Sequence, residues 1–238
     1  MHLRDLMQFL AELSENNNRA WFVMNKPRYD ILRAEFLELV TQVIADISRF
    51  DPSIAGCNPK KALFRINRDM RFSHDKRPYK TTFSSAITAS GMKKPSQGGG
   101  PSYYFQIDAA GRLLVAGGEY LPPSDRLRLL RQQVVDDADG FSKLLKNREF
   151  LTEFGGLQDE DKLMRLPKGF SADAPHQEYL KLKSFIAWKE TSIKNKVSSD
   201  LQKQLAANFK AVSPLMQWLR KVPLVSPAEE KTPDQLQR

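Results

Sequence analysis

The apolar positions of the first fifty residues recur at helical spacing. One stripe consists of Leu3, Leu6, Phe9, Leu10 and Leu13. The polar residues 14–18 favour turns and should end this helix. A second stripe at the same spacing begins after Pro27 and continues to Ile47, where Asp51-Pro52 ends it. We therefore expect two helices that pack as a pair.

Short apolar runs bounded by Gly, Pro and Asn follow from about Ala62. They cover residues 62–67, 82–88, 103–107 and 112–117, and this length and spacing are typical of strands. The Gly- and Pro-rich residues 91–101 are expected to form a mobile loop, and residues 108–111 a hairpin turn. The middle third of the chain therefore predicts an antiparallel sheet.

Helical spacing returns after the predicted sheet. Pro122-Pro123-Ser124 introduces one helix, for which Ser124 is the expected N-cap. Short helices and loops follow to about Phe185, and residues 197–219 predict a longer helix in which Pro214 introduces a kink. No repeat or shift in composition divides the chain. We expect an α+β fold, with one domain over residues 1–222 whose N- and C-terminal helices pack on the sheet, and a flexible tail over residues 223–238.

Positive charge is concentrated in one stretch of this 238-residue chain. The chain carries a formal net charge of +9 and has a pI near 9.6, which favours anionic partners. Between positions 60 and 80 there are eight Lys or Arg, at positions 60, 61, 65, 68, 71, 76, 77 and 80, against Asp69 and Asp75. This local surplus of +6 is two thirds of the total, so the stretch is the strongest candidate for an anion site.

Residues 64–80 join two predicted strands by an unusually long connection, and such loops are often functional. The spacing of Arg65, Arg68 and Arg71 lets at least two guanidinium groups face one site on either a strand or a helical turn. Their forked donors match phosphate or carboxylate oxygens. We expect Arg65, Arg68, Arg71, Lys76 and Lys80 to bind a small phosphorylated or carboxylated anion. The alternative reading is that these bases pair internally with carboxylates of the same loop.

Acid and base candidates are few. Asp69 and Asp75 lie in the basic loop, and Glu119 closes the fourth predicted strand, where it could face that loop or pair with its arginines. Two other functions stay open. Arg19 and the lysines beyond position 180 could extend the basic face into a sequence-independent nucleic-acid surface, and a large apolar patch would indicate a protein-interaction scaffold.

Several motifs are absent from the sequence. Residues 98–100 are three glycines without the Lys-Ser/Thr of a P-loop, and neither a dinucleotide-binding glycine motif nor a nucleophile elbow occurs. His2, His74 and His176 are scattered, and Cys57 is the only cysteine, so we expect no zinc site and no cofactor. The lone cysteine and the lack of a signal peptide or a membrane-length apolar run favour a cytoplasmic protein. No motif decides whether the protein is an enzyme.

Three stretches together resemble a known family. They are residues 64–80, the Asn-Asn-Asn-Arg-Ala-Trp-Phe run at 16–22, and Leu-Pro-Lys-Gly-Phe at 166–170. In their order along the chain, 16–22, 64–80 and 166–170, they resemble the bacterial and fungal domain-of-unknown-function family 2461, over about residues 3–220. The resemblance implies a single soluble domain of mixed secondary structure and transfers no catalytic residue. The family tends to show His-Pro after the third stretch, whereas this chain has Pro175-His176, so the resemblance gives His176 no role.

Overall fold

The N-terminal third is helical, as its apolar stripes predict. The computed structural model describes residues 1–69, 75–93 and 99–224. It begins with α1 (Leu3–Glu15), α2 (Arg19–Met24) and α3 (Lys26–Ser48), followed by the 3-10 turn η1 (Pro52–Ile54) and the short helix α4 (Pro59–Ala62). The two long helices are confirmed. Between them α2 forms as well, because the side chain of Asn18 accepts a hydrogen bond from the Trp21 N–H (2.9 Å) and caps its first turn.

In the described part of the chain, four antiparallel strands form one sheet in the order of the sequence. They are β1 (Thr82–Thr88), β2 (Ser102–Asp108), β3 (Arg112–Glu119) and β4 (Phe185–Ser192). The predicted turn at 108–111 joins β2 to β3, with Gly111 at φ 71°. Of the predicted mobile loop at 91–101, residues 94–98 lie outside the described part of the chain.

The prediction of a strand at residues 62–67 is wrong. The segment follows α4 and makes only isolated bridges, Leu63 with Ser85 and Asn67 with Tyr79. These bridges are separated by four residues on one side and six on the other, so the hydrogen-bond ladder cannot stay in register. The fourth strand is β4 instead, which lies between the short helices and loops predicted to about Phe185 and the helix predicted from residue 197.

The remaining helices precede and follow β4. They are α5 (Ser124–Asp136), α6 (Ala138–Leu145), α7 (Arg148–Phe154), α8 (Gln177–Leu180) and α9 (Ser198–Arg220). Ser124 does not cap α5, because the helix begins at Ser124 and the N-cap position is Pro123, which has no capping side chain. Pro214 lies inside α9 and has no N–H for the Lys210 carbonyl, which instead accepts from the Ser213 hydroxyl at 2.8 Å.

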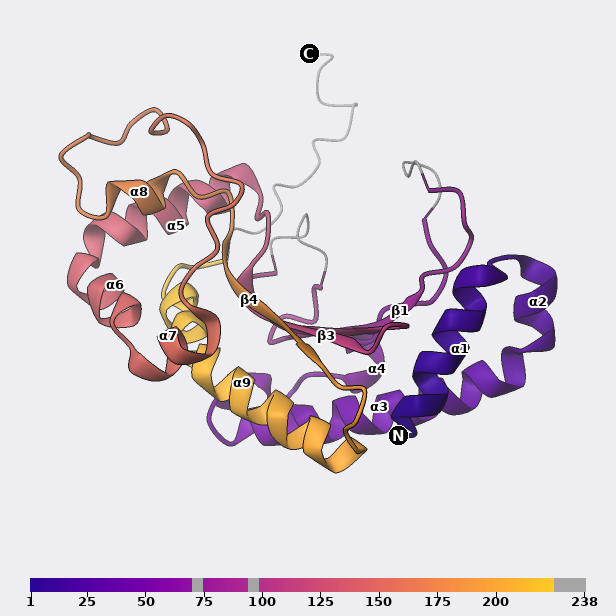
Figure 1. The fold of residues 1–238 in the computed structure, drawn as a ribbon. Coiled ribbons are helices and arrows are strands. Elements are labelled where there is room, and N and C mark those ends of the chain that lie inside the picture. The colour runs from indigo at the N-terminus through magenta and orange to yellow at the C-terminus, as the bar shows by residue number, and fades with distance from the viewer. Residues whose placement is uncertain (70–74, 94–98, 225–238) are drawn as a thin grey trace, which may run out of the picture.

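Helices α3 and α9 pack together beneath one face of the sheet (Figure 1). The buried positions of β2, Tyr103, Phe105 and Ile107, alternate with half-buried ones and point to this side. Gly117 allows the close approach of α9, because a Cβ there would lie 2.6 Å from Cγ1 of Val212. The α+β prediction, with helices from both ends of the chain against the sheet, is confirmed.

The opposite face of the sheet carries no helix in the described part of the chain (Figure 1). The pair α1 and α2 lies beyond the end of the sheet that carries the β2–β3 turn, where Met7 of α1 approaches Gly111, and α5 to α8 form a helical lobe beyond the opposite end of the strands. No described helix combines the length and apolar character needed to cross a bilayer. Most of the predicted tail, residues 225–238, lies outside the described residues, and Pro223 at its start accepts a hydrogen bond from Arg126 at 2.8 Å.

Candidate functional site: a cavity on the helix-free face of the sheet

The helix-free face of the sheet is hollowed into a cavity of about 470 Å³. Its floor includes one cross-strand row, in which the register aligns Ala86, Tyr104, Ala116 and Trp188. Side chains alternate along a strand, so these residues share the face that turns away from α3 and α9. The size lies within the range of small-molecule sites.

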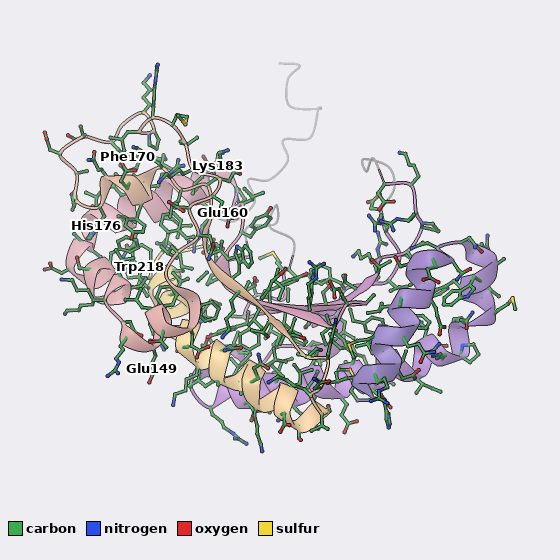
Figure 2. All side chains as sticks on the ribbon, in the orientation of Figure 1. Glu149, Glu160, Phe170, His176, Lys183 and Trp218 are labelled. Carbon is green, nitrogen blue, oxygen red and sulfur yellow. The ribbon has the colours of Figure 1, made fainter. Side chains whose placement is uncertain are left out.

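Chain segments at both sheet edges form the walls. On the β1 side, the Phe64 N–H donates to the Ser84 carbonyl (3.0 Å) and places the Phe64 ring at the cavity. On the β4 side, the Gln158 N–H donates to the Ile186 carbonyl (2.9 Å). This second wall carries Gln158, Glu160, Asp161 and Lys183. Figure 2 labels Glu160 and Lys183 there, between the sheet and the helical lobe.

Four cations gather at the Phe64 wall, and we call Arg65, Arg68, Lys80 and Lys93 the cation cluster. The ammonium groups of Lys80 and Lys93 lie 5.1 and 5.0 Å from the centroid of the Phe64 ring. Burial lowers the pKa of Lys80, and the nearby positive charges of Arg65, Lys93 and Arg68 lower it further. Like charges held this close favour an anion at the Phe64 end of the cavity.

Part of the predicted internal pairing is present. Asp75 forms ion pairs with Arg68 (2.8 Å) and with Arg77 (2.7 Å). Hydrogen bonds from Arg77 hold the pKa of Asp75 well below its usual range, with a further contribution from the charge of Arg68. Asp75 is thus shared between Arg68 and Arg77, and no printed ion pair joins it to Arg65 or Lys80.

The loop's two ends are fixed where they meet. The Arg68 N–H donates to the Pro78 carbonyl and the Lys80 N–H to the Ile66 carbonyl, both at 2.8 Å. Asn17 binds the opposite side of Tyr79: its amide donates to the Tyr79 carbonyl and its carbonyl accepts the Tyr79 N–H, both at 3.0 Å. The stretch at residues 16–22 thus supports the base of the basic loop at residues 64–80.

An aromatic contact strengthens the same junction. The Phe22 ring stacks on that of Tyr79 at 4.1 Å between centroids and an interplanar angle of 17°. Phe22 is buried and Trp21 packs against the core. The helix pair at the N-terminus therefore positions the basic loop.

The predicted anion-binding residues do not all lie at the cavity. Arg65, Arg68 and Lys80 come together beside the Phe64 ring, but none of the three lines the cavity, where Lys93 is the member of the cation cluster that does. Lys76 is exposed farther along the loop, as is Asp69, while Arg71 lies in residues 70–74, outside the described chain. The described residues contain no group of three His, Cys, Asp or Glu side chains arranged to hold a metal ion.

Glu119 does not face the basic loop, which was one of the two alternatives, and it pairs with an arginine outside that loop. Its carboxylate is buried and forms an ion pair with Arg126, whose guanidinium also donates to the carbonyls of Leu219 (3.1 Å) and Val222 (2.7 Å). Glu119 lies opposite Phe185 in the β3–β4 register, on the helix-covered face. The pair joins β3, α5 and the end of α9. A catalytic role for Asp69, Asp75 or Glu119 stays a prediction.

Three residues of the site were missed from the sequence. Lys93 comes from the Gly-rich loop, where its ammonium donates to the carbonyls of Lys61 (2.7 Å) and Leu63. Tyr104 and Trp188 form the aromatic part of the floor. The alternation of apolar and polar residues in β2 carried a signal for Tyr104, since it places a tyrosine among polar residues on the face opposite Tyr103, Phe105 and Ile107.

The fold and the cavity define an α+β protein that has a four-stranded antiparallel sheet, helices on one face and a basic-edged cavity on the other. The model of the family described as "Conserved hypothetical protein (DUF2461)" matches residues 5–218. The chain belongs to this family, as the resemblance of its three motifs predicted. Neither a curated protein nor a solved structure matches the chain.

Proposed function

We propose that the protein binds a small anionic organic molecule in the cavity on its helix-free sheet face. The observation that carries the proposal is the position of Lys80 and Lys93, whose ammonium groups both lie about 5 Å from a ring that lines the cavity. The phosphate or carboxylate of the ligand is bound at this end. The rest of the molecule lies over the floor, where apolar residues predominate.

Electrostatics favours an anion over a neutral ligand here. The lowered pKa of Lys80 reflects first the loss of hydration and then repulsion from Arg65, Lys93 and Arg68. A bound anion relieves that repulsion and replaces the lost hydration with hydrogen bonds. Arginine supplies the planar fork and lysine the compact charge, a combination suited to phosphate and carboxylate oxygens.

A nucleic-acid strand is the main competing ligand. It needs a basic track along which successive phosphates can bind, whereas the cation cluster occupies one edge of a bounded cavity. The opposite wall carries Glu160 and the ion pair between Asp161 and Lys183 (2.6 Å), so it offers no surplus of positive charge to a continuing phosphate backbone. A single anionic group with an organic body fits this distribution of charge better.

A thermal-shift screen at two salt concentrations tests the proposal. The panel contains sugar phosphates, mononucleotides, aromatic carboxylates and short oligonucleotides. A ligand at ten times its Kd adds about 1.4 kcal/mol to the free energy of unfolding, which raises Tm by about 4 °C in a chain of this size. We expect hits among the small anions, with modest salt dependence.

Matched variants locate the binding. Arg65→Gln combined with Lys80→Gln should abolish the shift, whereas Lys203→Gln combined with Lys210→Gln, two exposed lysines of α9, removes the same charge and should preserve it. Hits confined to oligonucleotides and lost steeply with salt would establish the nucleic-acid alternative instead. No hit in the whole panel would overturn the proposal.

A further inference from the structure

We infer that the ligand is a flat aromatic molecule bearing one anionic group, with its ring against Tyr104 and Trp188 and its anion toward the cation cluster. This inference rests on the proposed function for the anionic group. The aromatic part rests on separate observations, namely the side chains that line the floor and how they are held. The two parts can therefore fail independently.

Register places the two aromatic residues on either side of a small one. Tyr104 on β2 and Trp188 on β4 both pair with Ala116 on β3. Neighbouring strands lie about 4.8 Å apart, so the two aromatic residues are about 10 Å apart across the sheet. Ala116 contributes only a methyl group between them and is 2% exposed, so the larger neighbours cover it. Within this row the surface offered to a ligand therefore comes mainly from the two aromatic side chains, and Leu114 and Ile186 line the cavity beside them.

Hydrogen bonds to two glutamines fix this surface. The Tyr104 hydroxyl donates to Oε1 of Gln106 at 2.8 Å, which restrains the ring. The Gln158 amide donates to the Trp188 carbonyl at 3.2 Å, which ties the β4 wall to the strand that carries the indole. A surface ordered before binding loses little conformational entropy when the ligand arrives.

The aromatic surface continues to the cation cluster. The Phe64 ring meets Tyr104 edge-on, with centroids 6.1 Å apart and an interplanar angle of 72°. The same Phe64 ring contacts Lys80 and Lys93. A ligand whose ring lies on Tyr104 therefore has cations within reach of a short anionic substituent. Ring quadrupoles interact with another aromatic ring in specific geometries that a saturated ring cannot match.

Isothermal titration with three probes tests the inference on the full chain. The probes are 2-naphthoate, decahydro-2-naphthoate and 2-naphthylmethanol. The second keeps the carboxylate and carbon skeleton but is not flat, and the third keeps the flat ring but is neutral. We expect 2-naphthoate to bind about tenfold more tightly than either of the others.

Each outcome separates the two claims. Equal affinity for the saturated acid overturns the aromatic inference and leaves the proposed function standing. Equal affinity for the alcohol overturns the anionic part and leaves the aromatic inference standing. Failure of 2-naphthoate to bind, while another anion binds, also overturns the inference.

Substitution of the indole gives a second measurement. Trp188→Leu should weaken 2-naphthoate binding by about tenfold and leave decahydro-2-naphthoate binding unchanged, because only the flat ligand uses the indole. Trp188→Phe keeps a ring and should retain most of the affinity. Circular dichroism and the retained binding of the saturated acid confirm that the variants are folded. Equal losses for both acids in Trp188→Leu would contradict an aromatic preference.

Discussion

At the scale of single residues, the buried carboxylate of Asp51 stabilises the fold through hydrogen bonds and an ion pair with Arg220. Asp51 is buried, and its carboxylate accepts hydrogen bonds from the hydroxyls of Ser53 (2.6 Å) and Tyr103 (2.7 Å) and from Arg220 (2.6 Å). Burial acts to raise its pKa, but these hydrogen bonds and the charge of Arg220 outweigh burial and hold the pKa below the ordinary value.

Asp51→Asn should lower the free energy of unfolding by about 2 kcal/mol at neutral pH, because Arg220 loses a charged partner. A carboxylate whose pKa is depressed by folding stabilises the protein above its unfolded pKa, about 3.9. That contribution disappears as the pH falls through the folded pKa. The gap between wild type and variant should therefore be largest at neutral pH and shrink below about pH 4.

Urea unfolding at a series of pH values measures this gap. Asp173→Asn, at an exposed position, is the control and should change stability by less than about 0.5 kcal/mol throughout. A difference between wild type and Asp51→Asn that stays constant from neutral to acidic pH would show that the carboxylate charge does not stabilise the fold.

At the scale of elements, the junction between the N-terminal helices and the basic loop connects folding with the candidate site. Asn17 follows the end of α1 and makes two hydrogen bonds to the backbone of Tyr79. The adjoining residues Arg68 and Lys80 are held by their own backbone hydrogen bonds at the same place. Loosening Tyr79 therefore disturbs the cation cluster without removing any of its charges.

Asn17→Ala should cost about 1–2 kcal/mol of unfolding free energy and also weaken binding of 2-naphthoate. Asn16→Ala is the matched control, because Asn16 makes an exposed hydrogen bond to the Glu12 carbonyl within α1. Urea unfolding and isothermal titration on both variants measure the two effects. If Asn17→Ala lost stability with no change in affinity, the junction would support the fold alone.

The elements also show how far the sequence predicts the structure. Helices α1, α3 and α9 and strands β1 to β3 follow from periodicity, because each has a buried stripe or run that ends at clear breakers. Strand β4 does not, since Lys189, Glu190 and the lysines around it resemble a solvated helix face. Such charges are typical of an edge strand, and its pairing with β3 spans more than sixty residues.

The candidate site likewise contains residues that the sequence predicts and residues that it does not. The grouping of Arg65 and Arg68 with Lys80 follows from their density in the sequence. Lys93 was missed because its position beside Phe64 depends on contacts with the carbonyls of residues about thirty positions earlier. Glu119 was misplaced because no local pattern shows that Arg126, seven residues later, folds back onto it.

At the scale of the whole molecule, long-range contacts tie the two ends of the chain to the sheet. Asp51 joins Tyr103 on β2 to Arg220 at the end of α9, and Gln202 of α9 donates to Asp46 of α3 at 2.7 Å. The buried residues form a continuous cluster through α1, α3, the sheet and α9. We therefore expect residues 1–222 to unfold as a single cooperative domain.

Tryptophan residues lie in three separate parts of this domain: Trp21 in α2, Trp188 in β4 and Trp218 in α9. Cooperative unfolding predicts that urea transitions followed by tryptophan fluorescence and by far-UV circular dichroism coincide. Trp218→Phe removes the fluorescence signal of α9, and Trp21→Phe removes that of α2. In both variants the fluorescence and circular dichroism transitions should still coincide. Separated midpoints would show that the N-terminal helices or the helical lobe unfold independently.

The charge of the molecule supports one central claim, that the cation cluster at the cavity binds a small anion. The most direct test is isothermal titration of 2-naphthoate into wild type, Arg65→Gln/Lys80→Gln and the control Lys203→Gln/Lys210→Gln. We predict that the first pair of substitutions weakens binding by about tenfold or more, equivalent to about 1.4 kcal/mol, and that the control binds like wild type. Equal affinities for the three proteins would contradict the claim.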